Sequence, residues 1–138
     1  MVNDPTSKGE ITEATAHGLA EIRAKFGPAV LSVSCWDPHP WNKKSDHPRG
    51  KACDVYTSPA QRFAAGDGLA NGWRLAKWLR EHADRLGVSY VIWQGRIWSI
   101  AKPQDNDGWG RAYNGGGVYS PTDATGGHFD HIHVSFRR

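Results

Sequence analysis

Histidines and aspartates that could do chemistry gather in two segments of this 138-residue chain. The later segment, residues 126–135, contains His131 and His133, which lie two positions apart on an expected strand over 131–136. Side chains at i and i+2 of a strand project from the same face, so the two imidazoles point the same way. This pattern is typical of a metal site, and also of two histidines that face solvent.

The earlier segment, residues 45–54, places His47 at the end of a loop and Asp54 on a strand seven residues later. Gly50 allows the chain to turn sharply between them. An imidazole and a carboxylate can supply two ligands to a tetrahedral zinc ion, and a histidine from the later segment would be the third. The fourth position would then hold water, as in catalytic zinc sites. The alternative is that Asp54 is a strand-end carboxylate that caps a loop.

The two segments together form a two-part motif that covers most of the chain. The pattern S-x-H-x-x-G-x-A-x-D is filled by Ser45, His47, Gly50, Ala52 and Asp54, and D-H-x-H is filled by Asp130, His131 and His133. This arrangement resembles the zinc D-alanyl-D-alanine carboxypeptidase/endopeptidase family, which belongs to the group of hedgehog-type and lysostaphin-type folds. Residues 91–98 and 126–128 also resemble a subgroup from actinobacteria and their phages.

The resemblance implies a role for each residue of the motif. It implies that His47, Asp54 and His133 bind one zinc ion, that Asp130 is the general base, and that His131 is a non-ligand partner beside the zinc-bound water. The implied activity is hydrolysis of an amide bond in peptidoglycan stem peptides, as a D,D-carboxypeptidase or endopeptidase, for example the catalytic domain of an endolysin. The implied location is extracellular or in the cell wall.

Substrate contacts are less clearly marked in the sequence. Members of the family usually carry an arginine in a turn before the first motif, whereas residues 34–37 contain none. The candidate replacements are Arg49, Arg96 and Arg111. Aromatic faces pack on sugar rings and peptide stems, which favours a cleft wall made of Trp109, Tyr113 and residues 115–117. The alternative for this region is a solvated glycine-rich loop.

The remaining cysteines and histidines receive structural interpretations. Cys53 adjoins Asp54, so it faces the other side of its strand and is not expected to be a ligand. We expect a disulfide between Cys35 and Cys53 in an oxidising compartment, and two buried thiols otherwise. Among the other histidines, a structural or solvent-facing role is expected for His39 and His82. His128 is close to the site in sequence, and a core or surface position is expected for it, with lining of the site as the alternative.

The elements that must position these residues follow from periodicity and turn signals. Helices are predicted over 11–26, with a capping box of Ser7 and Glu10, and over 69–86, with Gly87 after the last turn. Strands are predicted over 29–35, 51–57, 88–93, 96–100 and 131–136, with loops over 36–50 and 101–127. This order favours an α+β fold with a small, mainly antiparallel sheet and two principal helices.

The family resemblance implies that this fold is hedgehog-like or D-Ala-D-Ala-peptidase-like. Residues 1–9 are expected to be a flexible lead-in to a single domain over 10–138.

Composition limits the classes of function. The chain is 38% hydrophobic, its net charge is +3, and no apolar run is long enough to cross a membrane or to act as a signal peptide. This mildly basic net charge is typical of proteins that bind anionic partners, and also of proteins whose charge only keeps them soluble. Scattered Lys and Arg argue against nucleic acid. We expect a monomer that acts as a zinc peptidase on peptidoglycan. The alternatives are a non-catalytic, metal-stabilised wall-binding module and a nucleic-acid-binding or His-metal nuclease domain.

Overall fold

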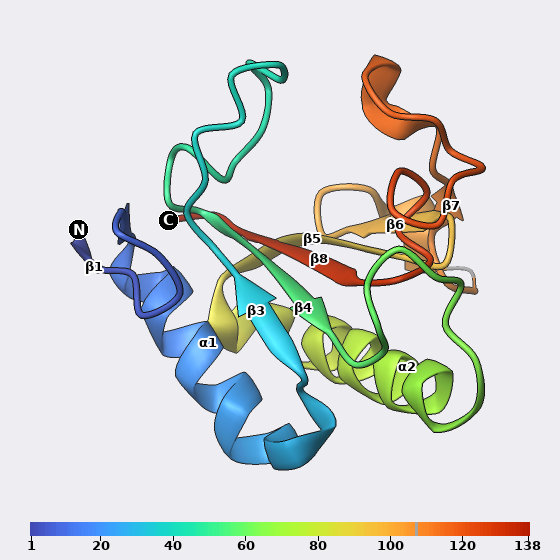
Figure 1. The fold of residues 1–138 in the computed structure, drawn as a ribbon, viewed down its shortest axis with the longest axis horizontal. Coiled ribbons are helices and arrows are strands. Elements are labelled where there is room, and N and C mark those ends of the chain that lie inside the picture. Colours follow the sequence, from blue (N-terminus) through green and yellow to red (C-terminus); the bar gives the residue numbers. More distant parts are fainter. Residues whose placement is uncertain (107) are drawn as a thin grey trace.

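A twisted antiparallel sheet forms the centre of the molecule (Figure 1), as a computed structural model describes it for residues 1–106 and 108–138. Among these residues the sheet has six strands in the order β3-β4-β8-β5-β6-β7, and every pairing is antiparallel. The strands are β3 (Ser32–Ser34), β4 (Ala52–Tyr56), β5 (Val88–Trp93), β6 (Arg96–Ser99), β7 (Arg111–Ala112) and β8 (Ile132–Phe136). The α+β class with an antiparallel sheet is therefore confirmed.

The helices lie on one side of the sheet, and long loops rise on the other side (Figure 1). The two main helices are α1 (Glu13–Phe26) and α2 (Gly66–Glu81), followed by the single turn of α3 (Ala83–Leu86). Short 3-10 turns occupy Gly27–Ala29, Pro103–Asn106 and Gly115–Gly117. No helix of the described residues is long and apolar enough to cross a membrane.

The sheet separates a hydrophobic face from a polar face by simple alternation. In β8 the side chains of Val134 and Phe136 enter the core, while those of His133 and Ser135 lie on the opposite face. Helix α2 packs so closely on β5 that a Cβ on Gly72 would lie 2.2 Å from the Trp93 ring. The core therefore fills the helical side, which leaves the other face of the sheet available for a site.

The helix ends differ from the sequence prediction in two places. The capping box of Ser7 and Glu10 is wrong: α1 begins at Glu13, and the Oγ1 atom of Thr12 accepts a hydrogen bond from the Thr15 amide. The predicted helix over 69–86 is divided at His82, whose backbone leaves the helical region. Its predicted end is confirmed, since Gly87 adopts a left-handed conformation with φ of 74°.

The first nine residues are packed against the domain, in contrast to the flexible lead-in that was expected. Strand β1 (Val2–Asn3) pairs with β2 (Glu10–Ile11) in a two-stranded ribbon. Between them, Asp4 is only 4% exposed and accepts hydrogen bonds from Thr6, Ser7 and the Trp36 amide. Composition alone does not predict that this segment is packed, because the packing depends on a hydrogen bond between the Asp4 carboxylate and the distant Trp36 amide.

Candidate metal centre

The polar face of the sheet brings together the two segments that the sequence marks. Antiparallel pairing of β4 and β8 sets Asp54 directly opposite His133. His47 comes from the loop that precedes β4, where the amide of Gly50 bonds the His47 carbonyl at 3.1 Å and Gly50 has a φ of 69°. This turn, which glycine adopts without strain, folds the His47 ring back over the sheet.

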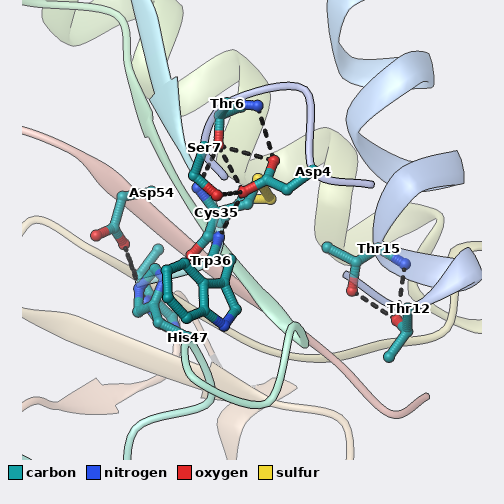
Figure 2. The surroundings of a disulfide bond; sticks show 11 residues. Asp4, Thr6, Ser7, Thr12, Thr15, Cys35, Trp36, His47 and Asp54 are labelled. Atoms are coloured by element: carbon teal, nitrogen blue, oxygen red, sulfur yellow. Dashed lines mark hydrogen bonds and ion pairs between the residues drawn. A yellow bond between two sulfur atoms is a disulfide. The ribbon is translucent and has the colours of Figure 1, made fainter. Parts of the chain in front are cut away.

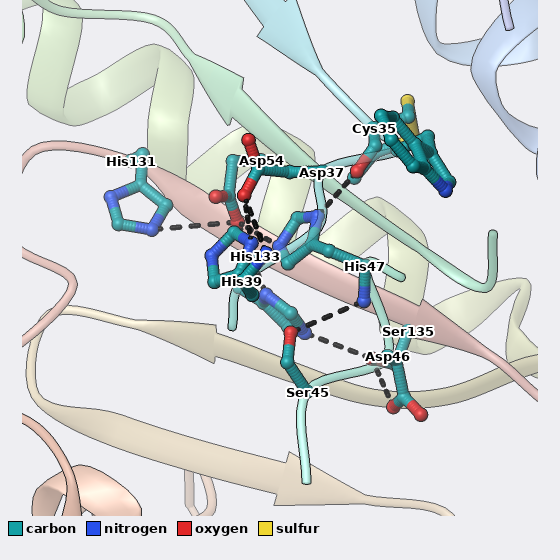
Figure 3. Close-up of polar contacts among 12 residues, drawn as sticks. Cys35, Asp37, His39, Ser45, Asp46, His47, Asp54, His131, His133 and Ser135 are labelled. Carbon is teal, nitrogen blue, oxygen red and sulfur yellow. Dashed lines mark hydrogen bonds and ion pairs between the residues drawn. A yellow bond between two sulfur atoms is a disulfide. The ribbon is translucent and has the colours of Figure 1, made fainter. Parts of the chain in front are cut away.

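The three side chains form a compact cluster (Figure 3). The Oδ1 atom of Asp54 lies 3.3 Å from Nε2 of His47 and 3.1 Å from Nδ1 of His133. Within the described residues, these three are the group whose potential ligand atoms all lie within 4.8 Å of one another. Bonds of about 2.0–2.1 Å to a tetrahedral zinc ion imply ligand–ligand separations of roughly 3.3–3.4 Å, so the spacing fits a metal ion.

The outer ring nitrogens of both histidines are held by hydrogen bonds. Nδ1 of His47 donates to the Cys35 carbonyl at 2.5 Å. Nε2 of His133 donates to Oγ of Ser135 at 2.8 Å, and that hydroxyl donates to Asp46 at 2.9 Å. These partners are acceptors, so a metal ion that replaced the protons facing Asp54 would meet the lone pairs of the inner nitrogens. Such support of the non-ligating nitrogen is usual for histidines that bind metals.

The charge state of the cluster also suits a cation. Burial raises the pKa of Asp54, but the charges of His131 and His47 and hydrogen bonds from the imidazoles hold it well below its usual value. Burial opposes charging of His47, yet the Asp54 carboxylate raises its pKa to about 9. Burial lowers the pKa of His133. A metal ion bound here would replace the proton on His47.

A second pair, His131 and Asp130, lies beside the cluster. Nδ1 of His131 bonds Oδ1 of Asp130 at 2.6 Å, and its Nε2 lies 3.5 Å from Oδ1 of Asp54. The other oxygen of Asp130 accepts hydrogen bonds from the Gln61 amide and the Thr125 hydroxyl, both at 2.7 Å. Burial disfavours charge on both groups, but these contacts lower the pKa of Asp130 and raise that of His131. Asp130 therefore orients His131, and it is His131 that lines the adjoining pocket.

A pocket of about 380 Å³ opens on the cluster. Its lining includes the apolar side chains of Ile92 and Ile97 and the aromatic rings of Tyr90 and Tyr113. At the rim, the indole of Trp41 donates a hydrogen bond of 3.1 Å to the Tyr119 hydroxyl. This contact joins loop 36–50 to the later loop, so the two regions predicted to be structureless together enclose the pocket.

The predicted substrate contacts are mostly placed elsewhere. Tyr113 lines the pocket, as do Gly115 and Gly116 of the glycine run, but the three arginines and Trp109 are not among the described residues that line it. Arg49 is exposed near Asp46, Arg96 bonds the carbonyls of residues 109 and 110, and Arg111 pairs with buried Asp105. The Trp109 ring meets Trp73 and Arg80 on the other side of the sheet. These residues support the fold around the site.

Several pocket residues were missed by the sequence analysis. His39 was expected to be structural or solvent-facing, but it stacks on His47 with ring centroids 4.7 Å apart and lines the pocket. His128 is buried and also lines the pocket, against His131, which was the alternative considered for it. Lys44, Tyr90 and Tyr119 also line the pocket. For Tyr90 a signal existed, because it shares the alternating face of β5 with Ile92. The others lie in loops, where no periodicity predicts direction.

The expected disulfide is present between Cys35 and Cys53, with an S–S distance of 1.98 Å. It joins the end of β3 to the residue before Asp54, and the Cys35 carbonyl holds His47. Figure 2 shows the N-terminal turn of Asp4, Thr6 and Ser7 against the same point, where Thr6 accepts the Cys35 amide proton. The cross-link therefore fixes the support of two members of the cluster.

Comparison with known families places the chain beside a described family. The model of the family described as VldE, C-terminal domain, matches residues 7–125, which is most of the chain and includes His47 and Asp54. The chain belongs to this family. The matched part of this VldE-type domain ends before His131 and His133, and the family description names no reaction. No curated protein and no solved structure is significantly similar to the chain.

Proposed function

We propose that this protein is a zinc-dependent hydrolase that cleaves an amide bond in peptidoglycan stem peptides. The observation that carries the proposal is the His47–Asp54–His133 cluster, whose potential ligand atoms lie within 4.8 Å of one another and which opens on a pocket. Two imidazoles and one carboxylate are a ligand set that suits zinc, and three protein ligands leave one position for water or substrate. Purely structural zinc sites are instead closed by four protein ligands.

Bound zinc would supply Lewis acidity that polarises the scissile carbonyl and lowers the pKa of water. The proton in this reaction is handled by His131, since it lines the pocket and its Nε2 lies near Asp54. Asp130 orients the ring through Nδ1. The family resemblance implies Asp130 as the general base. We transfer that role to His131 because Asp130 is fully buried and both of its oxygens accept hydrogen bonds.

The substrate class rests on the two-part motif and on the character of the pocket. The motif resembles the zinc D-alanyl-D-alanine carboxypeptidase/endopeptidase family at every fixed position. The aromatic and apolar walls suit the flat amides and methyl groups of a D-alanine-containing peptide. Lys44 also lines the pocket and would supply a positive charge for a substrate carboxylate. The proposal includes action as a monomer, outside the cell or in its wall.

Digestion of purified peptidoglycan, followed by mass spectrometry of the released muropeptides, tests this proposal. We expect new amide-bond cleavage products with the zinc-loaded protein, loss of cleavage after chelation, and recovery when zinc is added back. His133→Ala should lose cleavage, because it removes one ligand. Unchanged turnover by this variant would show that the cluster is not the catalytic centre.

The alternative of a metal-stabilised, non-catalytic wall-binding module gives a different result. His131→Gln leaves the three ligands in place, so it should keep zinc and abolish cleavage in an enzyme. If the protein is a binding module, the His131→Gln variant should sediment with peptidoglycan to the same extent as the unmodified protein. Neither protein should then release cleavage products. The two outcomes separate catalysis from binding.

A further inference from the structure

His128 occupies a position that the proposed mechanism does not use. Its side chain is only 7% exposed and lines the pocket. Its ring centroid lies 4.4 Å from that of His131 and 5.8 Å from that of His133, and the Tyr113 ring packs edge-on at 4.9 Å. The Nδ1 atom is inaccessible and has no hydrogen-bond partner among the described residues. A buried polar atom without a partner is costly, so its retention needs an explanation.

The backbone at His128 is held in a conformation that side chains other than glycine rarely adopt. Its φ is +60°, although two glycines immediately precede it in the sequence. The turn between β5 and β6 fixes this geometry, since the Gln94 amide bonds the His128 carbonyl at 2.8 Å and the Gly95 amide bonds the Gly127 carbonyl at 3.0 Å. Glycine at position 128 would avoid the strain. Strained residues of this kind cluster at functional sites.

An imidazole has two ring nitrogens that can take part in hydrogen bonds. It can therefore pair with the N–H or the C=O group of a peptide amide.

We propose that His128 is a substrate-binding residue, whose imidazole hydrogen-bonds the peptide amide group held beside the metal centre. The inference rests on the proposed function and deepens it, because it names the group that recognises the amide. His131 moves the proton, and His128, on the same side of the pocket, fixes the amide against it. The fold retains strain and a costly buried nitrogen at this position because the rest of the ring, which lines the pocket, recognises the substrate.

Two variants separate this role from a structural one. His128→Gly removes the ring and relieves the strain, and His128→Asn tolerates the same backbone and keeps a hydrogen-bonding side chain. We expect melting temperatures at or above that of the unmodified protein and zinc affinities within about threefold of it. On muropeptides, kcat should fall about 100-fold for His128→Gly and less for His128→Asn. His17→Asn, at an exposed position on α1, is the matched control and should change neither quantity.

A second readout does not depend on turnover. Acetohydroxamate, an amide-like probe that binds open metal positions, is titrated into the cobalt-loaded protein and followed by visible absorption. His128→Gly should weaken its binding at least about tenfold. Equal probe affinity and equal kcat in the variant would overturn the role of His128 and leave the proposed hydrolase intact. If His128→Gly weakens probe binding but the unmodified protein cleaves no wall peptide, His128 keeps its binding role and the peptidoglycan substrate is rejected.

Discussion

Ser135 connects the ligand histidine of β8 to a buried hydrogen-bond chain. It accepts from His133, donates to Asp46, and the same Asp46 oxygen accepts a hydrogen bond of 3.0 Å from the Tyr90 hydroxyl. This chain fixes which nitrogen of His133 carries the proton. It therefore directs the Nδ1 lone pair at the metal position and increases the basicity of the ligand.

Removal of this support should weaken metal binding. We predict that Ser135→Ala lowers zinc affinity about 10- to 100-fold, the range typical of lost second partners of ligand histidines. Competition with a chromogenic chelator measures the change. Ser34→Ala, at an exposed position on β3, is the control and should bind zinc as the unmodified protein does. Equal zinc affinities for all three proteins would show that Ser135 does not support the ligand histidine.

At the residue scale, the sequence predicts the members of the cluster better than their surroundings. His47, Asp54 and His133 share recognisable motifs, and strand alternation places the last two on one face. The same alternation would have placed Ser135 beside His133. In contrast, His39 and His128 have positive φ values of 38° and 60° in loops, and no local pattern predicts which way such side chains point.

At the scale of elements, the contact of α2 with β5 positions the polar face of the sheet. Gly72 lies against the fully buried Trp93 ring, and the next turn of α2 contributes Leu75 and Ala76 to the core. The absence of a side chain at position 72 allows the helix to approach closely. Any larger residue would push the helix and strand apart or displace the indole.

An alanine at this position should therefore destabilise the fold, although alanine favours helix by about 1 kcal/mol over glycine. We predict that Gly72→Ala lowers the free energy of unfolding by about 1–3 kcal/mol, the usual cost of overpacking a dense core. Urea denaturation measures the change. Asn71→Ala, on the half-exposed neighbouring position, should stay within about 0.5 kcal/mol of the unmodified protein. A stabilised Gly72→Ala variant would contradict the packing described here.

Element boundaries were predictable where a local chemical signal exists. Gly87 stops the helical region as predicted, and the Gln94-Gly95 turn joins β5 to β6. The start of α1 was misplaced because two possible caps stand within five residues, Ser7 and Thr12. Tertiary contacts decide between them: the Ser7 hydroxyl bonds Asp4 instead, which leaves Thr12 to cap the helix.

At the scale of the whole molecule, the N-terminal segment supports the metal centre through a chain of contacts. Asp4 accepts the Trp36 amide proton, Thr6 accepts that of Cys35, and the Cys35 carbonyl holds His47. The sequence could not reveal this, because about thirty residues separate the partners. The segment is thus part of the folded unit.

This arrangement predicts a defined loss of stability in acid. Burial raises the pKa of Asp4, but hydrogen bonds from Ser7, Thr6 and Trp36 outweigh it and lower the pKa below the ordinary 3.8. Its stabilising effect is therefore complete at neutral pH and is lost as the pH falls through the folded-state pKa. We predict that Asp4→Asn costs about 2 kcal/mol at pH 7. Denaturation curves at several pH values should show this difference shrinking below about pH 4. A difference independent of pH would reject an ionic role for Asp4.

The central claim is that one metal ion binds to His47, Asp54 and His133 with a free position that faces the pocket. Anomalous diffraction at the zinc edge, from crystals grown with zinc, tests it most directly. The account predicts one peak about 2.0–2.2 Å from Nε2 of His47, Oδ1 of Asp54 and Nδ1 of His133, with no fourth protein ligand. A peak at other residues, a fourth protein ligand that closes the site, or no bound metal would contradict it.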